Sequence, residues 1–111
     1  MASRAAAARL VLVTASSEEE AASIGRTLVE ERLAACTNLI GPIRSIYRWQ
    51  GNVEDEREYL LVIKTRAELY PKIEKRVREL HSYQTPEVIS VQILDGSAPY
   101  LAWLLESTAD L

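Results

Sequence analysis

Alternation of apolar and polar side chains is clearest between Ile43 and Thr65. The first half of this segment has a period of two, which is typical of a strand with one covered face. One set of alternate positions contains Ile43, Ser45, Tyr47 and Trp49, and the other contains Arg44, Ile46 and Arg48. After the turn signal Gly51-Asn52, a second run from Glu58 to Thr65 is rich in Tyr, Leu, Val and Ile. The segment therefore predicts a long β-hairpin.

This hairpin is long for so short a chain. Each arm approaches or exceeds about ten residues, whereas strands usually have about five or six. A chain of 111 residues has few other elements with which to cover it. Its far end would expose unpaired backbone edges and aromatic side chains, which proteins normally cover. We therefore expect other copies of the chain to cover the hairpin in an obligate oligomer.

The start of the chain predicts a strand followed by a helix. The run Leu10–Ala15 is nearly continuously apolar, as in a strand that is buried on both faces. Ser16 or Ser17 then offers an N-cap, and a glutamate three residues later completes a capping box. We predict a helix from Ser17 to about Glu31.

Two further extended segments flank the second half of the chain. One runs from Leu33 to Trp49, and Pro42 within it predicts an edge strand or a bulge. The other, Val88–Leu94, alternates apolar and polar residues and predicts a strand with one covered face. Ala98-Pro99 then opens a final short helix, with proline near its first position.

A second helix follows the hairpin. Thr65 and Glu68 resemble a capping box, but that start would place Pro71 in the helix interior at a cost of about 3 kcal/mol. We therefore predict a later start, with Pro71 near the first turn. The apolar face of this helix contains Leu69, Ile73, Val77 and Leu80.

The predicted order is strand, helix, strand, strand, helix, strand, with a short helix appended. This is the split βαβ order of the ferredoxin-like fold, which belongs to the α+β class. Both connecting helices would lie on one face of an antiparallel sheet and leave the other face in need of cover. We expect one domain over residues 9–111 after a flexible tail, residues 1–8.

Composition narrows the classes of function. The chain carries 13 Lys plus Arg against 16 Asp plus Glu, a formal charge of -3, which argues against nucleic acid as a partner. Cys36 is the only cysteine, so an intrachain disulfide cannot form and a reducing compartment fits best. No apolar run approaches the ~20 residues that cross a bilayer. We expect a cytoplasmic protein without a membrane segment, with a trimmed organelle-targeting segment as the alternative for the Ala-rich start.

Several polar residues have both a structural and a functional interpretation. His81, the only histidine, lies where the second helix ends and could interact with the helix dipole, or act as a ligand or proton donor with Glu87 brought near by a turn. Cys36 fits a buried, unreactive thiol better than a metal ligand. Lys64-Thr65 could be a strand end that reaches solvent or an anion-binding corner beside a helix start. No catalytic constellation is visible, so we expect a protein without enzymatic activity.

Five motifs in order resemble one family. They are Arg32-Leu-Ala-Ala-Cys-Thr-Asn38, Tyr47-Arg-Trp-Gln-Gly51, Ile63-Lys-Thr65, His81-Ser-Tyr-Gln-Thr-Pro-Glu87 and Tyr100-Leu-Ala-Trp-Leu104. Together they resemble the CutA divalent-cation tolerance proteins over nearly the whole chain from Leu10 onward. The resemblance implies a ferredoxin-like subunit in a tight homotrimer whose long hairpins pack against neighbours.

The resemblance also implies a set of sites. Clefts between subunits would bind divalent metal, with copper(II) as a ligand that folding does not require. Binding is expected to be weak, because Val13 and Leu80 stand where some copper-binding members have ligands. The expected metal ligands are His81, Cys36 and Glu87; the ligand cleft adds Asn38, Lys64, Thr65 and Tyr83; and the subunit interface contains Tyr47, Trp49, Gly51 and Trp103, large residues of a kind that marks interfaces.

Three hypotheses follow. The first is a trimer that contributes to divalent-cation tolerance and binds copper between its subunits. The second is a PII-like regulatory module that binds a small anion through Lys64 and the helix start after Thr65. The third is a scaffold whose clefts serve a protein partner, which the sequence does not identify.

Overall fold

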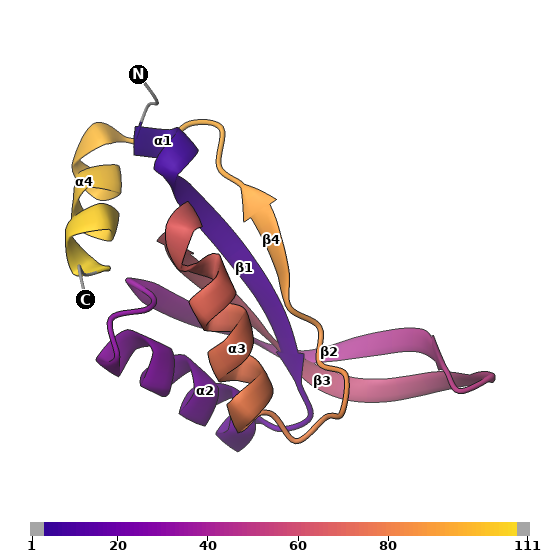
Figure 1. Cartoon of the computed structure of the whole chain (residues 1–111). Coiled ribbons are helices and arrows are strands. Elements are labelled where there is room, and N and C mark those ends of the chain that lie inside the picture. Colours follow the sequence, from indigo (N-terminus) through magenta and orange to yellow (C-terminus); the bar gives the residue numbers. More distant parts are fainter. Residues whose placement is uncertain (1–3, 109–111) are drawn as a thin grey trace.

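Four antiparallel strands form the framework of the chain, which a computed structural model describes over residues 4–108 (Figure 1). They are β1 (Ala8–Ala15), β2 (Cys36–Trp49), β3 (Asn52–Arg66) and β4 (Ile89–Gln92), in the sheet order β2-β3-β1-β4. The helices are α1 (Arg4–Ala7), α2 (Glu18–Glu30), α3 (Tyr70–Leu80), which the 3₁₀ turn η1 (Ala67–Leu69) precedes, and α4 (Ala98–Ser107). The predicted α+β class and the order of its main elements are confirmed.

The main core lies between one face of the sheet and the helices α2 and α3. Alternate strand residues point to opposite faces, and the set that faces the helices is fully buried. This core contains Val11, Val13, Leu61 and Ile63 from the strands and Ile24, Leu28, Ile73 and Val77 from the helices. Both helices therefore cover the same face, as the predicted order of elements requires.

The opposite face of the sheet has little cover from the rest of the chain, and we call it the open face. Its apolar residues alternate with the core set along the four strands and are partly or well exposed. They are Leu10 and Leu12 of β1, Ile40 of β2, Leu60 and Val62 of β3, and Ile89 and Val91 of β4. We expected the apolar side of the last strand to be covered, but Ile89 and Val91 are 50% and 41% exposed in the single chain. That strand is also shorter than the predicted Val88–Leu94.

Strands β2 and β3 form the long hairpin, which extends well beyond the body of the molecule (Figure 1). They have 14 and 15 residues, so the predicted hairpin is confirmed and its second arm begins earlier, at Asn52 rather than Glu58. The turn residues are Gln50 and Gly51, with φ of 48° and 83°, one position before the predicted Gly51-Asn52. Two positive φ values give a turn whose twist matches that of the strands.

A bulge interrupts β2 at Gly41-Pro42, whose peptide bond is cis. Ile40 pairs with Leu60 and Ile43 pairs with Glu58, so three steps along β2 match two along β3. Because side chains alternate, the bulge changes which residues of β2 reach the open face. Before it the open-face residues are even-numbered, and after it they are odd-numbered. The prediction from Pro42 is confirmed, since β2 is both an edge strand and bulged.

Local signals set the helix starts. Ser17 is the N-cap of α2, and its hydroxyl accepts a hydrogen bond from the Glu20 amide at 3.1 Å, which is one half of the predicted capping box. The Glu20 carboxylate contacts the amide of Ser16 instead of that of Ser17. Helix α3 begins at Tyr70, so Pro71 lies in its first turn and the predicted late start is confirmed.

Helices α1 and α4 pack together at the end of the molecule away from the hairpin (Figure 1). Ala5 and Ala8 form a second apolar cluster with Leu101 and Leu104. Segment 1–8, expected as a flexible tail, thus contains α1, whereas residues 1–3 lie outside the described residues. Within the described part of the chain, no helix is long and apolar enough to span a membrane.

Candidate functional site

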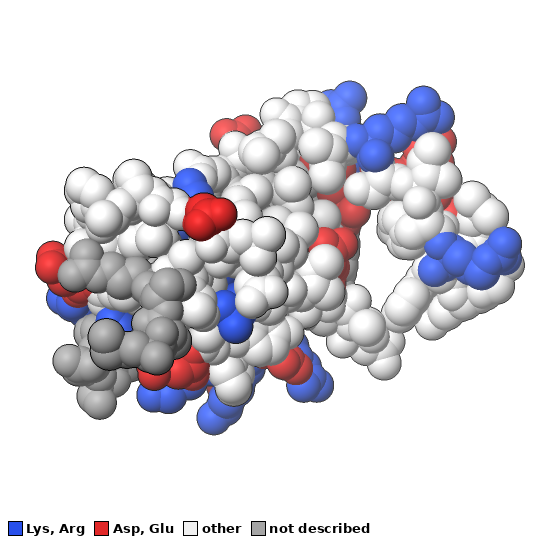
Figure 2. All heavy atoms as spheres, turned by 90° about the horizontal axis from the view of Figure 1, so that it is seen from above, with Lys and Arg blue, Asp and Glu red and all other residues white. Residues whose placement is uncertain are grey.

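A cleft of about 510 Å³ lies where the hairpin leaves the body, and we call it the root cleft. Strands β1, β2 and β3 supply part of its wall, and the loop between α3 and β4 supplies the rest. Figure 2 shows carboxylates gathered where the projecting arm meets the body. The lining residues are Thr14, Ser45, Ile46, Tyr47, Glu58, Tyr83, Thr85, Pro86 and Glu87.

Glu58 is the most buried charged residue of the root cleft, with 5% of its surface exposed. Its Oε2 accepts a hydrogen bond of 2.7 Å from the hydroxyl of Tyr83. Burial raises the pKa of Tyr83, and the carboxylate of Glu58 raises it further. Tyr83 therefore stays a neutral donor, which is what a buried carboxylate needs.

His81 lies behind the root cleft, and its ring is fully engaged with the backbone. Nε2 lies 2.7 Å from the carbonyl oxygen of Thr14, and Nδ1 accepts a hydrogen bond of 3.0 Å from the amide of Tyr83. A carbonyl can only accept and an amide can only donate, so the ring is neutral with its proton on Nε2. Both nitrogens hold the loop in place, and neither has a free lone pair for a metal.

Glu20 ties the same loop to α2. Its Oε2 accepts a hydrogen bond of 2.8 Å from the Ser82 amide, and its Oε1 lies within hydrogen-bond reach of Ser16. Partial burial alone would raise the pKa of Glu20, but the hydrogen bonds from Ser82 outweigh it, so the net pKa is lowered. The loop after His81 is thus held through the amides of both Ser82 and Tyr83.

The electrostatics of the root cleft are anionic. Partial loss of water raises the pKa of Glu87, although this residue is exposed in the single chain, and the charge of Glu58 raises that pKa further. Loss of water also raises the pKa of Tyr47, and Glu58 adds to that rise. Among the described residues that line the cleft, none is a lysine or an arginine. The cleft can therefore hold a cationic group through oxygen atoms.

A second polar group lies on the open face, around Lys64 near the end of β3. Its Nζ donates to Asn38 Oδ1 at 2.5 Å and lies 3.9 Å from Cys36 Sγ. Cys36 is the direct strand partner of Lys64, so the pairing of β2 with β3 brings these three predicted site residues together.

Thr65 lies on the other face of the sheet. It is fully buried, and its hydroxyl donates to the Leu33 carbonyl oxygen at 2.7 Å. The ammonium of Lys64 and the hydroxyl of Thr65 therefore point to opposite faces. The expected anion-binding corner of Lys64 and the helix start after Thr65 stays a prediction, in which the Thr65 hydroxyl has no part.

The three predicted metal ligands do not converge within one chain. Cys36 is level with Lys64, whereas His81 contacts Thr14, which is paired with Leu60. Four residues of β3 separate these levels, or about 13 Å. Among the described residues, no three His, Cys, Asp or Glu side chains lie close enough to bind a metal ion together.

The predicted interface residues are exposed in the single chain. Tyr47 and Trp49 lie on the same side of the hairpin as the open face, since they pair with Glu54 and Asn52, and Gly51 forms the turn beyond them. Trp103 of α4 is also exposed, and its ring lies 5.4 Å from that of Tyr100 between centroids.

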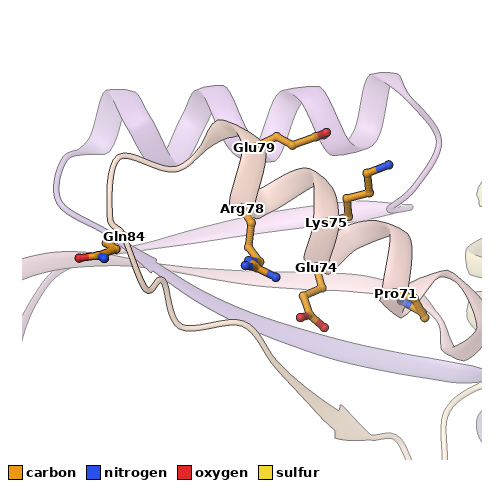
Figure 3. A pocket seen from close by; sticks show the side chains of 6 residues that line it. All are labelled: Pro71, Glu74, Lys75, Arg78, Glu79 and Gln84. Atoms are coloured by element: carbon orange, nitrogen blue, oxygen red, sulfur yellow. The ribbon is translucent and has the colours of Figure 1, made fainter.

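A further hollow of about 470 Å³ lies beside α3. Figure 3 shows Glu74 and Arg78 on one side of the helix, whereas Lys75 and Glu79 point to the other side. The mixed charges and their divergent directions describe a solvated helix surface. As a candidate binding site it is weaker than the root cleft, where several oxygen atoms line one opening.

Glu58 is the functional candidate that sequence reasoning missed. It is one of four acidic residues between Glu54 and Glu58, and the local spacing does not distinguish it from the exposed ones. The signal would have been its place at the start of an apolar run, on the same side of the strand as Leu60 and Val62. A carboxylate in that register predicts either burial with a partner or an interface.

Comparison with known proteins identifies close relatives. Residues 9–107 match the sequence model of the family described as CutA1 divalent ion tolerance protein. The divalent-cation tolerance protein CutA of Thermus thermophilus is 48% identical over 99 residues, which cover 89% of this chain and 96% of that protein. Protein CutA of Homo sapiens is 45% identical over 96 residues, which cover 86% of this chain and 54% of that protein, so the chain spans about half of its length.

Solved structures agree with this result. The CutA1 structure from Oryza sativa superposes with a TM-score of 0.92 at 37% identity and covers 98% of this chain and 100% of that one. The divalent cation tolerance protein from Thermus thermophilus gives a TM-score of 0.89 at 47% identity, with coverage of 92% and 99%.

Proposed function

Because the chain belongs to the CutA1 divalent ion tolerance family, we propose that it contributes to divalent-cation tolerance as a homotrimer that binds copper(II) weakly in clefts between subunits. Each subunit is a ferredoxin-like domain, in keeping with the strand order β2-β3-β1-β4. The proposed role is binding rather than catalysis. The solitary Cys36 suits a reducing compartment, so we place the trimer in the cytoplasm.

The observation that carries the proposal is the open face together with the long hairpin. Apolar residues from all four strands lie partly or well exposed there, and an apolar patch of this kind marks an interaction surface. The hairpin adds Tyr47 and Trp49 on the same side. A second copy of the chain supplies the matching cover, and a closed ring of copies leaves no face open.

The donor set explains why metal binding is weak. Copper(II) accepts imidazole and thiolate ligands, and the chain has one of each, in His81 and Cys36. These residues lie at different levels of the sheet, so a site that uses both needs ligands from two subunits. His81 must also give up a hydrogen bond to the backbone before it can bind metal. Glu87, exposed beside the root cleft, supplies a third ligand.

The test is native mass spectrometry of the purified protein with and without a modest excess of copper(II). We expect a trimer that takes up a whole number of copper ions per assembly. His81→Ala and Cys36→Ser should each reduce this uptake, because no other histidine or cysteine can replace them. Glu30→Gln is the control, since that carboxylate is exposed on α2 away from the root cleft.

A monomeric mass would contradict the assembly. A trimer whose copper uptake is the same in both variants would contradict the metal site and leave the assembly in place. A small-anion sensor is then the next candidate, with Lys64 as its cation; it has less support because Thr65 is buried on the other face. A thermal shift caused by an anion and lost in Lys64→Ala would favour it.

A further inference from the structure

The open face carries opposite charges at its two ends. At the hairpin end, the root cleft presents the carboxylates of Glu58 and Glu87. At the other end, Lys64 presents its ammonium beside Asn38 and Cys36. Lys64 follows Glu58 by six residues of one strand, which is about 20 Å. Apolar residues of the open face, such as Val62 and Leu12, occupy the space between the two ends.

Within residues 4–108, each end lacks a partner of opposite charge. In the described part of the molecule, the Lys64 ammonium has no carboxylate partner; its contacts are the amide oxygen of Asn38 at 2.5 Å and the sulfur of Cys36 at 3.9 Å. Glu87 likewise has no hydrogen bond or ion pair in the described residues. Glu58 uses one oxygen for Tyr83 and lies beside the open cleft.

We propose that Lys64 of one subunit enters the root cleft of the partner subunit and pairs there with Glu87 and Glu58. This inference rests on the trimer proposed above and adds the residues that set its register. A head-to-tail contact between copies brings unlike ends of the open face together. The root cleft is then a shared site, completed by a residue of the second copy.

Charge complementarity favours this register over others. A contact between like ends of two open faces would place carboxylates against carboxylates, and contacts between like charges are unfavourable at interfaces. The apolar residues between the ends provide the area of the contact, and the ion pair fixes its direction. A divalent cation that enters the cleft has to compete with the Lys64 ammonium for the same carboxylates, which gives a second physical reason for weak metal binding.

A charge-swap experiment tests the pairing. Lys64→Glu and Glu87→Lys should each raise the dissociation constant of the trimer about tenfold or more. The double variant restores the opposite charges and should bring dissociation back to near that of the unmodified protein. Lys72→Glu is the matched control, because that lysine is exposed on α3, and it should leave dissociation unchanged. Dissociation is measured by native mass spectrometry over a dilution series.

The chain separates Lys64 from Glu87 too widely for a contact within one subunit, so rescue in the double variant reports a contact between subunits. If a swapped chain does not fold, Lys64→Gln, Glu87→Gln and the variant that combines them replace the charge swaps. The two residues are coupled if the effect of the combined variant on trimer dissociation differs from the sum of the two single effects. An unmodified protein that is monomeric overturns the proposed assembly. A trimer in which both sets of effects simply add overturns the Lys64 pairing and leaves the assembly standing.

Discussion

Glu58 and Tyr83 join the hairpin to the loop before β4 through one hydrogen bond of 2.7 Å. The carboxylate is 5% exposed, so it has exchanged most of its water for this donor. Removing one partner of such a pair costs more than the bond contributes, because the remaining group stays buried without compensation. The bond is therefore a sensitive point of the root cleft.

Tyr83→Phe tests this bond without a large change of shape. We expect the free energy of unfolding to fall by about 1–3 kcal/mol, since Glu58 loses its donor. Urea unfolding at one fixed protein concentration measures the change, because the proposed subunit association would make stability depend on concentration. Tyr100→Phe is the control, as Tyr100 is exposed on α4; its effect should stay within about 0.5 kcal/mol. Equal effects of the two variants would show that the hydroxyl of Tyr83 has no special role.

The pH dependence of stability has a defined contribution from Glu20. Its pKa in the folded chain lies below the ordinary value of 4.5, because the hydrogen bonds from Ser82 outweigh the effect of burial. A carboxyl group with a lowered folded pKa stabilises the protein at pH values above 4.5, and this contribution is lost as pH falls through the folded pKa.

We therefore expect Glu20→Gln to reduce the loss of stability between neutral pH and acid. The measurement is the urea midpoint from pH 7 down to about pH 3. Glu19→Gln, on the exposed side of the same turn, should retain the slope of the unmodified protein. A Glu20→Gln curve parallel to that of the unmodified protein would contradict the assignment.

Among the contacts of single residues, the sequence predicted those between residues that are close together in the chain. The Ser17–Glu20 cap follows from spacing alone, because both partners lie in one helical turn. The contacts of Glu58 with Tyr83 and of His81 with Thr14 join residues that are 25 and 67 positions apart. No local pattern encodes such pairs, since they depend on how the strands and the loop come together.

Among the elements, the hairpin depends on two glycines for different reasons. A Cβ atom at Gly41 would lie 2.3 Å from Cδ1 of Tyr59, inside the bulge. A Cβ atom at Gly51 would meet nothing within 4 Å, but its φ of 83° lies in the left-handed region. The first position is limited by space and the second by backbone conformation.

Alanine at each glycine separates the two effects. Gly41→Ala should lower the free energy of unfolding by about 1–3 kcal/mol, because Tyr59 or the bulge has to move. Gly51→Ala should cost about 1 kcal/mol from left-handed strain alone. Removing the Tyr59 ring in Tyr59→Ala should abolish the additional cost at Gly41 and leave the cost at Gly51 unchanged. Non-additivity at Gly51 rather than Gly41 would contradict this account.

The hairpin also shows where element prediction fails. Residues 52–57 read Asn-Val-Glu-Asp-Glu-Arg, a charged stretch without strand propensity. They are nevertheless a strand, because each one pairs with a residue of β2 between Arg44 and Trp49. Pairing with a well-defined partner outweighs local composition there. The apolar run from Glu58 onward, in contrast, was recognisable because its burial leaves a direct trace in the sequence.

For the whole molecule, the proposed assembly depends on the open face. Leu12 lies on the central strand β1, between Val62 of β3 and Ile89 of β4. Leu12→Glu would place a carboxylate in the middle of an apolar contact, where a charge without a partner is unfavourable. We expect this variant to remain folded and to become monomeric in light scattering coupled to size exclusion.

Arg26→Glu is the control for added negative charge, because Arg26 is exposed on α2, away from the open face. It should keep the mass of the unmodified protein. A Leu12→Glu protein that is folded and has the mass of the unmodified protein would place the subunit contact elsewhere.

The open face itself could be predicted, since the order of the elements sends both long helices to one side of the sheet. The packing of α1 against α4, at the end of the molecule away from the hairpin, could not be predicted. Helix α1 and the contact between Ala5 and Leu104 depend on α4 returning to the start of β1. An alanine-rich start has no apolar pattern that reveals such a partner.

The bulge at Gly41-Pro42 acts on the hairpin like a one-letter shift of a reading frame: it puts odd-numbered rather than even-numbered side chains of the outer arm on the open-face side. Deleting one residue between Ile40 and Ile43 would restore regular pairing and leave Ile43 opposite Glu58, so every later side chain of β2 would keep its side. Regular pairing without a deletion would instead shift the arm by one residue, and Arg44, Ile46 and Arg48 would take the side that Tyr47 and Trp49 now occupy. The bulge therefore absorbs one extra residue without changing which side chains of the arm face a neighbouring surface.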